Sequence, residues 1–177
     1  MIVSNMHTIT LHSDMDTKPT DLHDFYFTYI ALLRAGAVWF HSAHHVSRGV
    51  SFAGDHVSLY PQIYNFFVET VDNVVEKSVA QCGSELACPQ EQLAAATQVV
   101  CCYPSPPSLS PTAIAAAGLC IVNDAIQFLE EQFRNLDGLG QLSLGLNDMI
   151  MSHASRLEDL AYLLKQRVAV EMDASSA

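Results

Sequence analysis

Three histidines, His41, His44 and His45, lie three and four residues apart in a segment with helical periodicity. Side chains at these spacings project from neighbouring positions on one face of a helix. A neutral imidazole nitrogen is a common ligand for zinc, copper, iron and nickel. The cluster therefore indicates a metal site, and the alternative is a solvated helix face that is rich in histidine.

Two carboxylates, Asp72 and Glu76, lie one helical turn apart in a later segment, where Asn65 and Glu69 extend the same polar stripe. Residues four apart are neighbours on a helix surface, so both carboxylates can reach one cation. The same spacing is also common on exposed helices that bind no metal. The pair is a convincing set of metal ligands only if the fold can bring it to the histidines.

Four long helical segments and one short one are expected to position these groups. Apolar residues recur at helical spacing over residues 22–47, 59–81, 111 onward and 139–168, and a short helical piece covers residues 90–97. Thr20 is expected to cap the first helix and Ser110 the third. Two helices, a long crossover and two more helices predict an all-α, ferritin-like four-helix bundle with a short helix in its crossover.

The chain has 177 residues, of which half are hydrophobic and 15% are charged, and this composition fits one folded domain. We expect a flexible N-terminal tail over residues 1–21, the bundle over 22–168 and a C-terminal tail over 169–177. A formal net charge of −11 favours cations as partners. Residues 1–24 hold a single cation, Lys18, and the C-terminal tail is acidic, so binding to nucleic acid is not expected.

No apolar run approaches the roughly twenty residues that a membrane-spanning helix needs, because the longest are about eleven residues. The N-terminus lacks the basic patch and apolar core of a secretory signal. These features predict a cytoplasmic protein without membrane contact. The five cysteines form no CxxC motif and are expected to be reduced thiols. The alternative is a redox pair or a soft-metal site at Cys82/Cys88 or Cys101/Cys102.

The stretch from His44 to His56 resembles the ferroxidase segment of the mini-ferritins, the DNA-protection-during-starvation (Dps) proteins. Counting from the first histidine, that family places Gly at +5, Phe at +8 and a second His at +12. Gly49, Phe52 and His56 occupy these three positions. The likeness is weaker elsewhere, including the segment ASRLEDL at residues 154–160, and covers roughly residues 22–168.

The sequence also departs from the family pattern. His45 stands where the family often has Trp, and Tyr60 stands where it usually has Asp. Asp72 and Glu76 follow His44 at +28 and +32, one residue later than in the family.

One extra residue rotates a helix by about 100°, so it must be absorbed before the acidic pair. Tyr60-Pro61 is the expected place, and without this adjustment Val71 and Val75 would face the site. An alternative register makes His45 the ligand in place of His44, and either histidine can be a spare ligand.

Imidazole and carboxylate ligands without a nearby thiolate suit a redox-active first-row ion better than a Cys-type zinc site. None of the eight Glu residues has His three positions later, which disfavours a ferritin-type site within one subunit. The resemblance implies instead that the histidines of one subunit and the Asp72/Glu76 pair of its two-fold mate share the iron. The implied metal ligands are His44, His56, Asp72 and Glu76, with His41 and His45 as further candidates.

The resemblance implies a homo-dodecameric shell that oxidises Fe(II) with hydrogen peroxide or dioxygen and stores ferric mineral. Such a shell would protect against iron-driven oxidative damage. Asp137 and Asp148 are candidates for the lining of its pores. The alternative is a non-enzymatic, ferritin-like shell whose site is degraded or binds another metal such as Zn or Cu.

Overall fold

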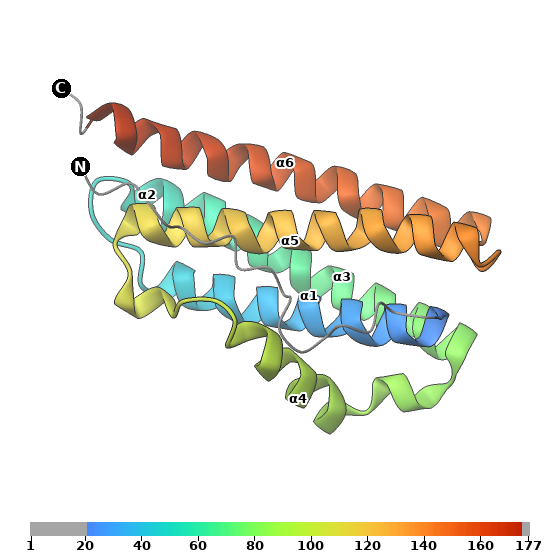
Figure 1. Ribbon diagram of the computed structural model, residues 1–177. Helices are drawn as coiled ribbons and strands as arrows, with labels where there is room; N and C mark the ends of the chain where they lie inside the picture. The colour runs from blue at the N-terminus through green and yellow to red at the C-terminus, as the bar shows by residue number, and fades with distance from the viewer. Residues whose placement is uncertain (1–20, 175–177) are drawn as a thin grey trace.

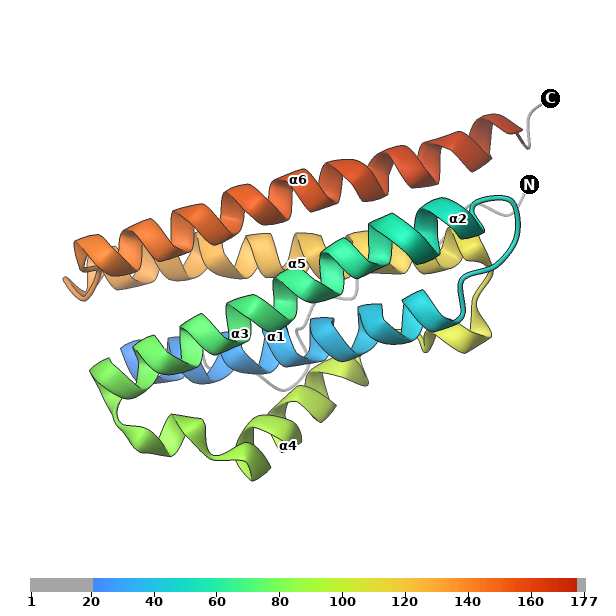
Figure 2. The same ribbon diagram turned by 180° about the vertical axis from the view of Figure 1, so that it is seen from behind.

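The computed structural model describes residues 21–174 of the chain, with side chains to residue 169, and these residues form an all-α bundle (Figures 1 and 2). The four long helices are α1 (Leu22–His45), α3 (Tyr60–Cys82), α5 (Pro111–Gly138) and α6 (Leu144–Ala174). Helices α1 and α3 form one packed pair, and α5 and α6 form the other. No strand occurs in residues 21–174, and the expected ferritin-like fold class is confirmed.

The crossover between the two pairs contains the short helix α4 (Pro89–Val100), flanked by 3₁₀ turns at Ser84–Ala87 and Pro106–Ser108. Helix α4 packs along α1 on the outside of the bundle (Figure 1). Two side-chain hydrogen bonds hold the crossover to α1: Arg34 Nε donates to Gln92 Oε1 at 2.7 Å, and Trp39 Nε1 donates to the carbonyl of Pro104 at 3.0 Å. The crossover is therefore a fixed part of the surface beside α1.

The ends of the helices follow local capping chemistry. The carboxylate of Asp21 accepts a hydrogen bond from the Asp24 N–H at 3.0 Å and caps α1, so the expectation that Thr20 is the cap was wrong by one residue. Ser110 caps α5 as predicted, because its Oγ accepts from the Ala113 N–H at 3.2 Å.

The fourth long helix starts later than the sequence pattern indicated. Residues 139–143 form the connection instead of the first turn of α6, since α5 continues to Gly138 and Gly140 adopts a positive φ of 67°. Ser143 Oγ then accepts from the Leu146 N–H at 3.2 Å and caps α6. At its other end α6 continues to Ala174, beyond the expected end at residue 168.

Helix α5 is long and apolar enough to cross a membrane by length and composition, although the sequence pattern predicted no such segment. Its apolar side chains have partners inside the bundle: Ile114, Val122 and Leu129 are almost completely buried. A core helix of a bundle meets the same criteria of length and hydropathy, and the packing of α5 accounts for its composition.

Close packing sets the position of α1 relative to α3. The ring of Phe67 on α3 stacks on Phe40 of α1, with 5.7 Å between ring centroids. The same ring lies against Gly36, where an added Cβ would come within 2.7 Å of it. Glycine at position 36 therefore allows the two helices to approach closely, and this approach sets the relative position of the histidines and the carboxylates that the two helices carry.

His153 on α6 lies among the aromatic side chains of the bundle. Its Nδ1 shares a hydrogen bond with the Tyr29 hydroxyl at 3.1 Å, and the Phe66 ring meets it edge-on at 6.3 Å. Burial, and to a smaller extent the positive charge of Lys77, lower the pKa of His153 to about 4. The folded protein therefore holds this imidazole in its neutral form.

We expect the protein to lose stability as the pH falls from about 6.5 to about 4, because in this range the unfolded chain binds a proton at His153 that the folded chain does not. Above this range the stabilising contribution is fully present. The loss should amount to about 2 kcal/mol after allowance for partial contact with water. Urea unfolding of the protein and of His153→Gln across this pH range measures it, and parallel pH profiles for the two proteins would refute it.

Candidate metal centre

Two of the predicted ligands, His44 and His56, come together although twelve residues separate them. Their rings stack with centroids 4.0 Å apart and planes 12° apart, and Phe52 stacks on the other face of His56 at 4.8 Å. His44 belongs to the last turn of α1, Phe52 begins the short helix α2 (Phe52–Gly54), and His56 lies in the π-helical turn Asp55–Leu59. The connector between α1 and α3, residues 46–59, thus folds back so that both imidazoles lie at one end of the α1–α3 pair.

Hydrogen bonding leaves each of these two imidazoles with a nitrogen available for a ligand. His56 Nδ1 lies 2.9 Å from the backbone carbonyl of His44, an acceptor only, so this nitrogen donates and His56 Nε2 keeps its lone pair. His44 Nδ1 is buried and has no hydrogen-bond partner among the residues that the structure describes. Burial and the neighbouring imidazole of His56 lower the pKa of His44. A neutral ring with an unpaired nitrogen is the form that binds a metal.

A buried ion pair anchors the connector to α6. Arg167 Nε donates to both carboxylate oxygens of Asp55, at 2.9 and 3.1 Å, and Arg167 Nη2 donates to Ser51 Oγ at 2.5 Å. The side chains of Asp55 and Arg167 are 4% and 10% exposed. Sequence reasoning missed this pair, because 112 residues separate its members and neither belongs to a recognisable motif. Asp55 immediately precedes His56, so the ion pair also positions that histidine.

A π-helical turn lies between the histidines and the acidic pair, in the segment where an extra residue has to be accommodated. In this turn the N–H of Tyr60 bonds the carbonyl of Asp55, five residues back, which accommodates one more residue than an α-helical turn. The turn ends immediately before Tyr60-Pro61, where the adjustment was expected. Val71 is buried in the core, and Asp72 and Glu76 are exposed on α3.

The structure does not bring Asp72 and Glu76 to the histidines of the same chain. Tyr64 is the residue of α3 whose ring lies beside His41 and His44, with centroids 5.2 and 5.7 Å apart. Asp72 follows eight residues later, which is about 12 Å along the helix. One chain alone therefore cannot place the acidic pair and the imidazoles around a single ion.

The other two histidines form a pair of their own. His41 and His45 are exposed on α1, and their Nε2 atoms lie 3.2 Å apart. His45 therefore faces His41, whereas His44 stacks on His56. The four imidazoles divide into two neighbouring pairs, and this division favours His44 over His45 as the partner of His56.

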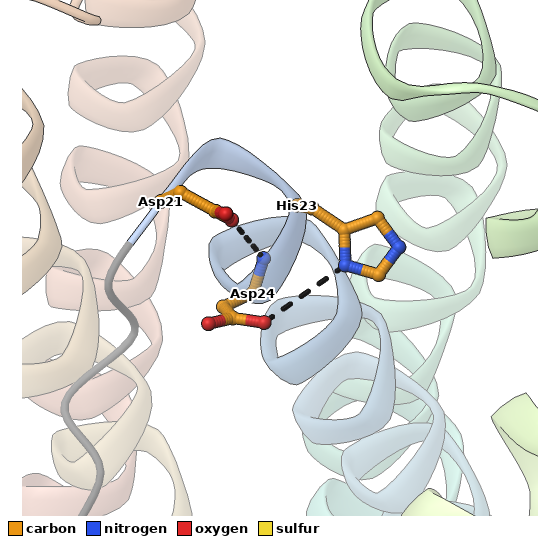
Figure 3. Close-up of side chains that lie close together, drawn as sticks. All are labelled: Asp21, His23 and Asp24. Atoms are coloured by element: carbon orange, nitrogen blue, oxygen red, sulfur yellow. Dashed lines mark hydrogen bonds and ion pairs between the residues drawn. The ribbon is translucent and has the colours of Figure 1, made fainter.

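Asp21, His23 and Asp24 are the one group of three candidate ligand side chains whose ligand atoms all lie within 4.8 Å of one another in the described part of the chain (Figure 3). Figure 3 shows that Asp21 points to the Asp24 N–H and that the Asp24 carboxylate faces the His23 ring. Asp24 Oδ1 and His23 Nδ1 are 3.9 Å apart. This group occupies the first turn of α1, where the helix dipole attracts anions and repels cations. Its carboxylates complement that dipole, which explains their presence without a metal.

All five cysteines are free in the structure. Asp137 lies exposed at the end of α5, and Asp148 lies exposed in the second turn of α6. None of these residues belongs to the His44–His56 stack.

Comparisons with solved structures identify the fold. An archaeal Dps homologue from Halobacterium salinarum superposes with a TM-score of 0.70 and 19% identity, over 82% of this chain and 78% of that chain. Dps from Mycobacterium smegmatis, in a tetragonal form, superposes with a TM-score of 0.65 and 18% identity, over 82% of this chain and 85% of that chain. Comparison of the sequence with protein-family models and with curated proteins gives no match. The resemblance to Dps proteins seen in the sequence is thus confirmed at the level of the fold.

Proposed function

We propose that this chain is a mini-ferritin of the Dps type that oxidises Fe(II) at sites shared between two copies. The observation that carries the proposal is the His44–His56 stack at 4.0 Å, in which His44 Nδ1 and His56 Nε2 have no hydrogen-bond partner among the described side chains of residues 21–169. The second half of each site is the Asp72/Glu76 pair of the other copy. Hydrogen peroxide or dioxygen is the oxidant, and the ferric product is stored inside a closed, dodecameric shell.

An exposed apolar surface on the outer face of α1, α3 and α4 supports the contact between copies. Val38, Val68 and Leu93 are 62%, 55% and 60% exposed, and they border a groove of about 210 Å³. The remaining lining is mostly small or apolar: Arg34, Ala35, Ala37, Val71, Ala96, Thr97 and Val100. Large apolar side chains gathered on one face are typical of a protein–protein interface. A second copy of this chain is the partner we infer.

A two-fold axis that crosses α3 near Val68 would bring the imidazoles of one chain to the Asp72/Glu76 pair of the other. Tyr64, which lies beside His44, comes four residues before Val68, and Asp72 comes four residues after it. In an isologous contact the same surface is used twice, so two α3 helices run antiparallel across the axis. Asp72 of one copy then lies at the level of Tyr64 of the other, next to the imidazoles. The contact generates two equivalent sites.

The proposed ligand set suits the reaction. Two carboxylates and two imidazoles bind Fe(II) and also stabilise the more highly charged Fe(III), while positions not taken by protein remain open to the oxidant. Two Fe(II) ions, one hydrogen peroxide and two protons yield two Fe(III) ions and two waters. The net charge of −11 favours the entry of the cation, and Asp137 and Asp148 are proposed to line its path. Free cysteines agree with a reducing, cytoplasmic location, which is part of the proposal.

Substitution of Val68 by glutamate tests whether the site depends on the contact. Near a two-fold axis the new carboxylate would face the same carboxylate of the other chain. The repulsion between the two charges, together with the lost apolar contact, should separate the chains. We expect light scattering to show a smaller species and rapid Fe(II) oxidation to disappear with the assembly. Met151→Glu, at a 60% exposed position on α6 outside the groove, is the matched control. A Val68→Glu protein of unchanged size and rate would contradict the proposed interface.

A further inference from the structure

We propose that His41 and His45 form a second metal site, separate from the His44–His56 stack, that binds Zn(II) or Cu(II). The two residues lie one turn apart on α1, both are exposed, and their Nε2 atoms converge to 3.2 Å. This proposal does not depend on the iron chemistry proposed above, because it uses different side chains and a different class of ion.

The distance between the two nitrogens fits a shared ion. Zinc binds imidazole nitrogen at about 2.0–2.1 Å in tetrahedral geometry, so two nitrogens on one zinc lie about 3.3–3.4 Å apart. The observed 3.2 Å between His41 Nε2 and His45 Nε2 is close to that separation. An ion can therefore enter with small rotations of two exposed side chains and no movement of the helix backbone. In its absence the same nitrogens share one hydrogen bond.

The ligand type favours particular ions. A site of nitrogen ligands without carboxylate suits zinc, copper and nickel, and for a given site the affinity rises from Mn(II) and Fe(II) to Cu(II). Two imidazoles leave the other coordination positions to water, so the ion should be exchangeable. Next to this pair, the centroid of His44 lies 5.0 Å from that of His45 and 6.3 Å from that of His41. The α1 helix thus carries two adjacent sites of different composition.

Metal titrations of the assembled protein carrying Asp72→Ala, which removes a carboxylate from the proposed iron site, test the inference. Zn(II) is titrated against a chromophoric chelator, and Cu(II) is followed by electron paramagnetic resonance, which reports nitrogen ligands. In this background we expect one ion per chain at this site. His41→Gln and His45→Gln should each weaken its binding by at least about tenfold, since each removes one of two imidazoles.

His23→Gln is the matched control, because His23 also lies on α1 but belongs to the Asp21/His23/Asp24 group. We expect it to retain the ion. Undiminished Zn(II) and Cu(II) binding in both His41→Gln and His45→Gln would overturn the inference, as would loss of the ion in His23→Gln alone. Because iron oxidation is not measured, a negative result here leaves the proposed ferroxidase function to its own tests.

Discussion

Replacement of Asp72 by alanine is expected to slow rapid Fe(II) oxidation by at least about 100-fold while leaving the assembly intact. Asp72 is exposed on α3 and supports no part of the core, so its loss should not unfold the chain. It is proposed to bind iron held by the histidines of the other copy. Residues that hydrogen-bond to metal ligands typically change activity by 10–100-fold when they are replaced, and removal of a direct ligand should lower the oxidation rate more than that. Stopped-flow absorbance of the ferric product measures the rate.

Glu158→Ala is the matched control for this prediction. Like Asp72→Ala, it removes one negative charge from an exposed helical position, but the position lies on α6. We expect its oxidation rate to stay close to that of the unsubstituted protein. An Asp72→Ala protein that oxidises iron at the unsubstituted rate would rule out the assignment of this carboxylate.

A mixture of two inactive chains provides a sharper test of the shared site. Asp72→Ala lacks one ligand of the acidic half and His56→Ala lacks one ligand of the imidazole half, so each assembly alone should oxidise Fe(II) only slowly. In a mixed dimer, one site receives both intact halves and the other receives neither. Random pairing of the co-expressed chains makes half of the dimers mixed, so about a quarter of the sites should be active. A site contained within one chain would regain nothing on mixing.

The second large effect is expected from Arg167→Ala, which should destabilise the fold by about 3–5 kcal/mol. The substitution leaves the buried carboxylate of Asp55 without its guanidinium, and breaking one side of a buried ion pair costs this much. Because Asp55 precedes His56, the rate of iron oxidation should fall as well. Thermal and urea unfolding measure the stability, and the stopped-flow assay measures the rate.

Arg156→Ala is the natural comparison, since Arg156 forms an exposed pair with Asp159 at 3.6 Å on the same helix. An exposed pair contributes about 0–1 kcal/mol, so the change should be small. The double variant Asp55→Leu/Arg167→Met removes both charges from the buried site and should recover much of the stability. Equal losses in Arg167→Ala and Arg156→Ala would show that burial of the Asp55 pair has no energetic consequence.

The sequence was sufficient to predict the long helices and their order in the bundle, although not all of their ends. Apolar side chains recur with the period of the α-helix, and caps such as Ser110 depend on residues within one turn. The predicted start of α6 was wrong because Leu142, which packs against the core, continues the apolar spacing into a connection that turns at Gly140. Apolar spacing shows which residues contact the core. A connection that packs on the core can therefore continue the spacing of the helix that follows it.

For the candidate site, the sequence determined which side chains are available and their spacing, because ligand type and helical offset are local properties. The spacing of His41 and His45 already placed them one turn apart on one face of α1, whereas the His44–His56 stack and the π-helical turn appeared only in the folded chain. Each depends on how the connector folds back over the end of α1, and the Asp55–Arg167 pair anchors that connector across 112 residues. Tertiary structure decided these contacts because they depend on the packing of segments far apart in the chain. A local sequence pattern does not show which distant segments pack together.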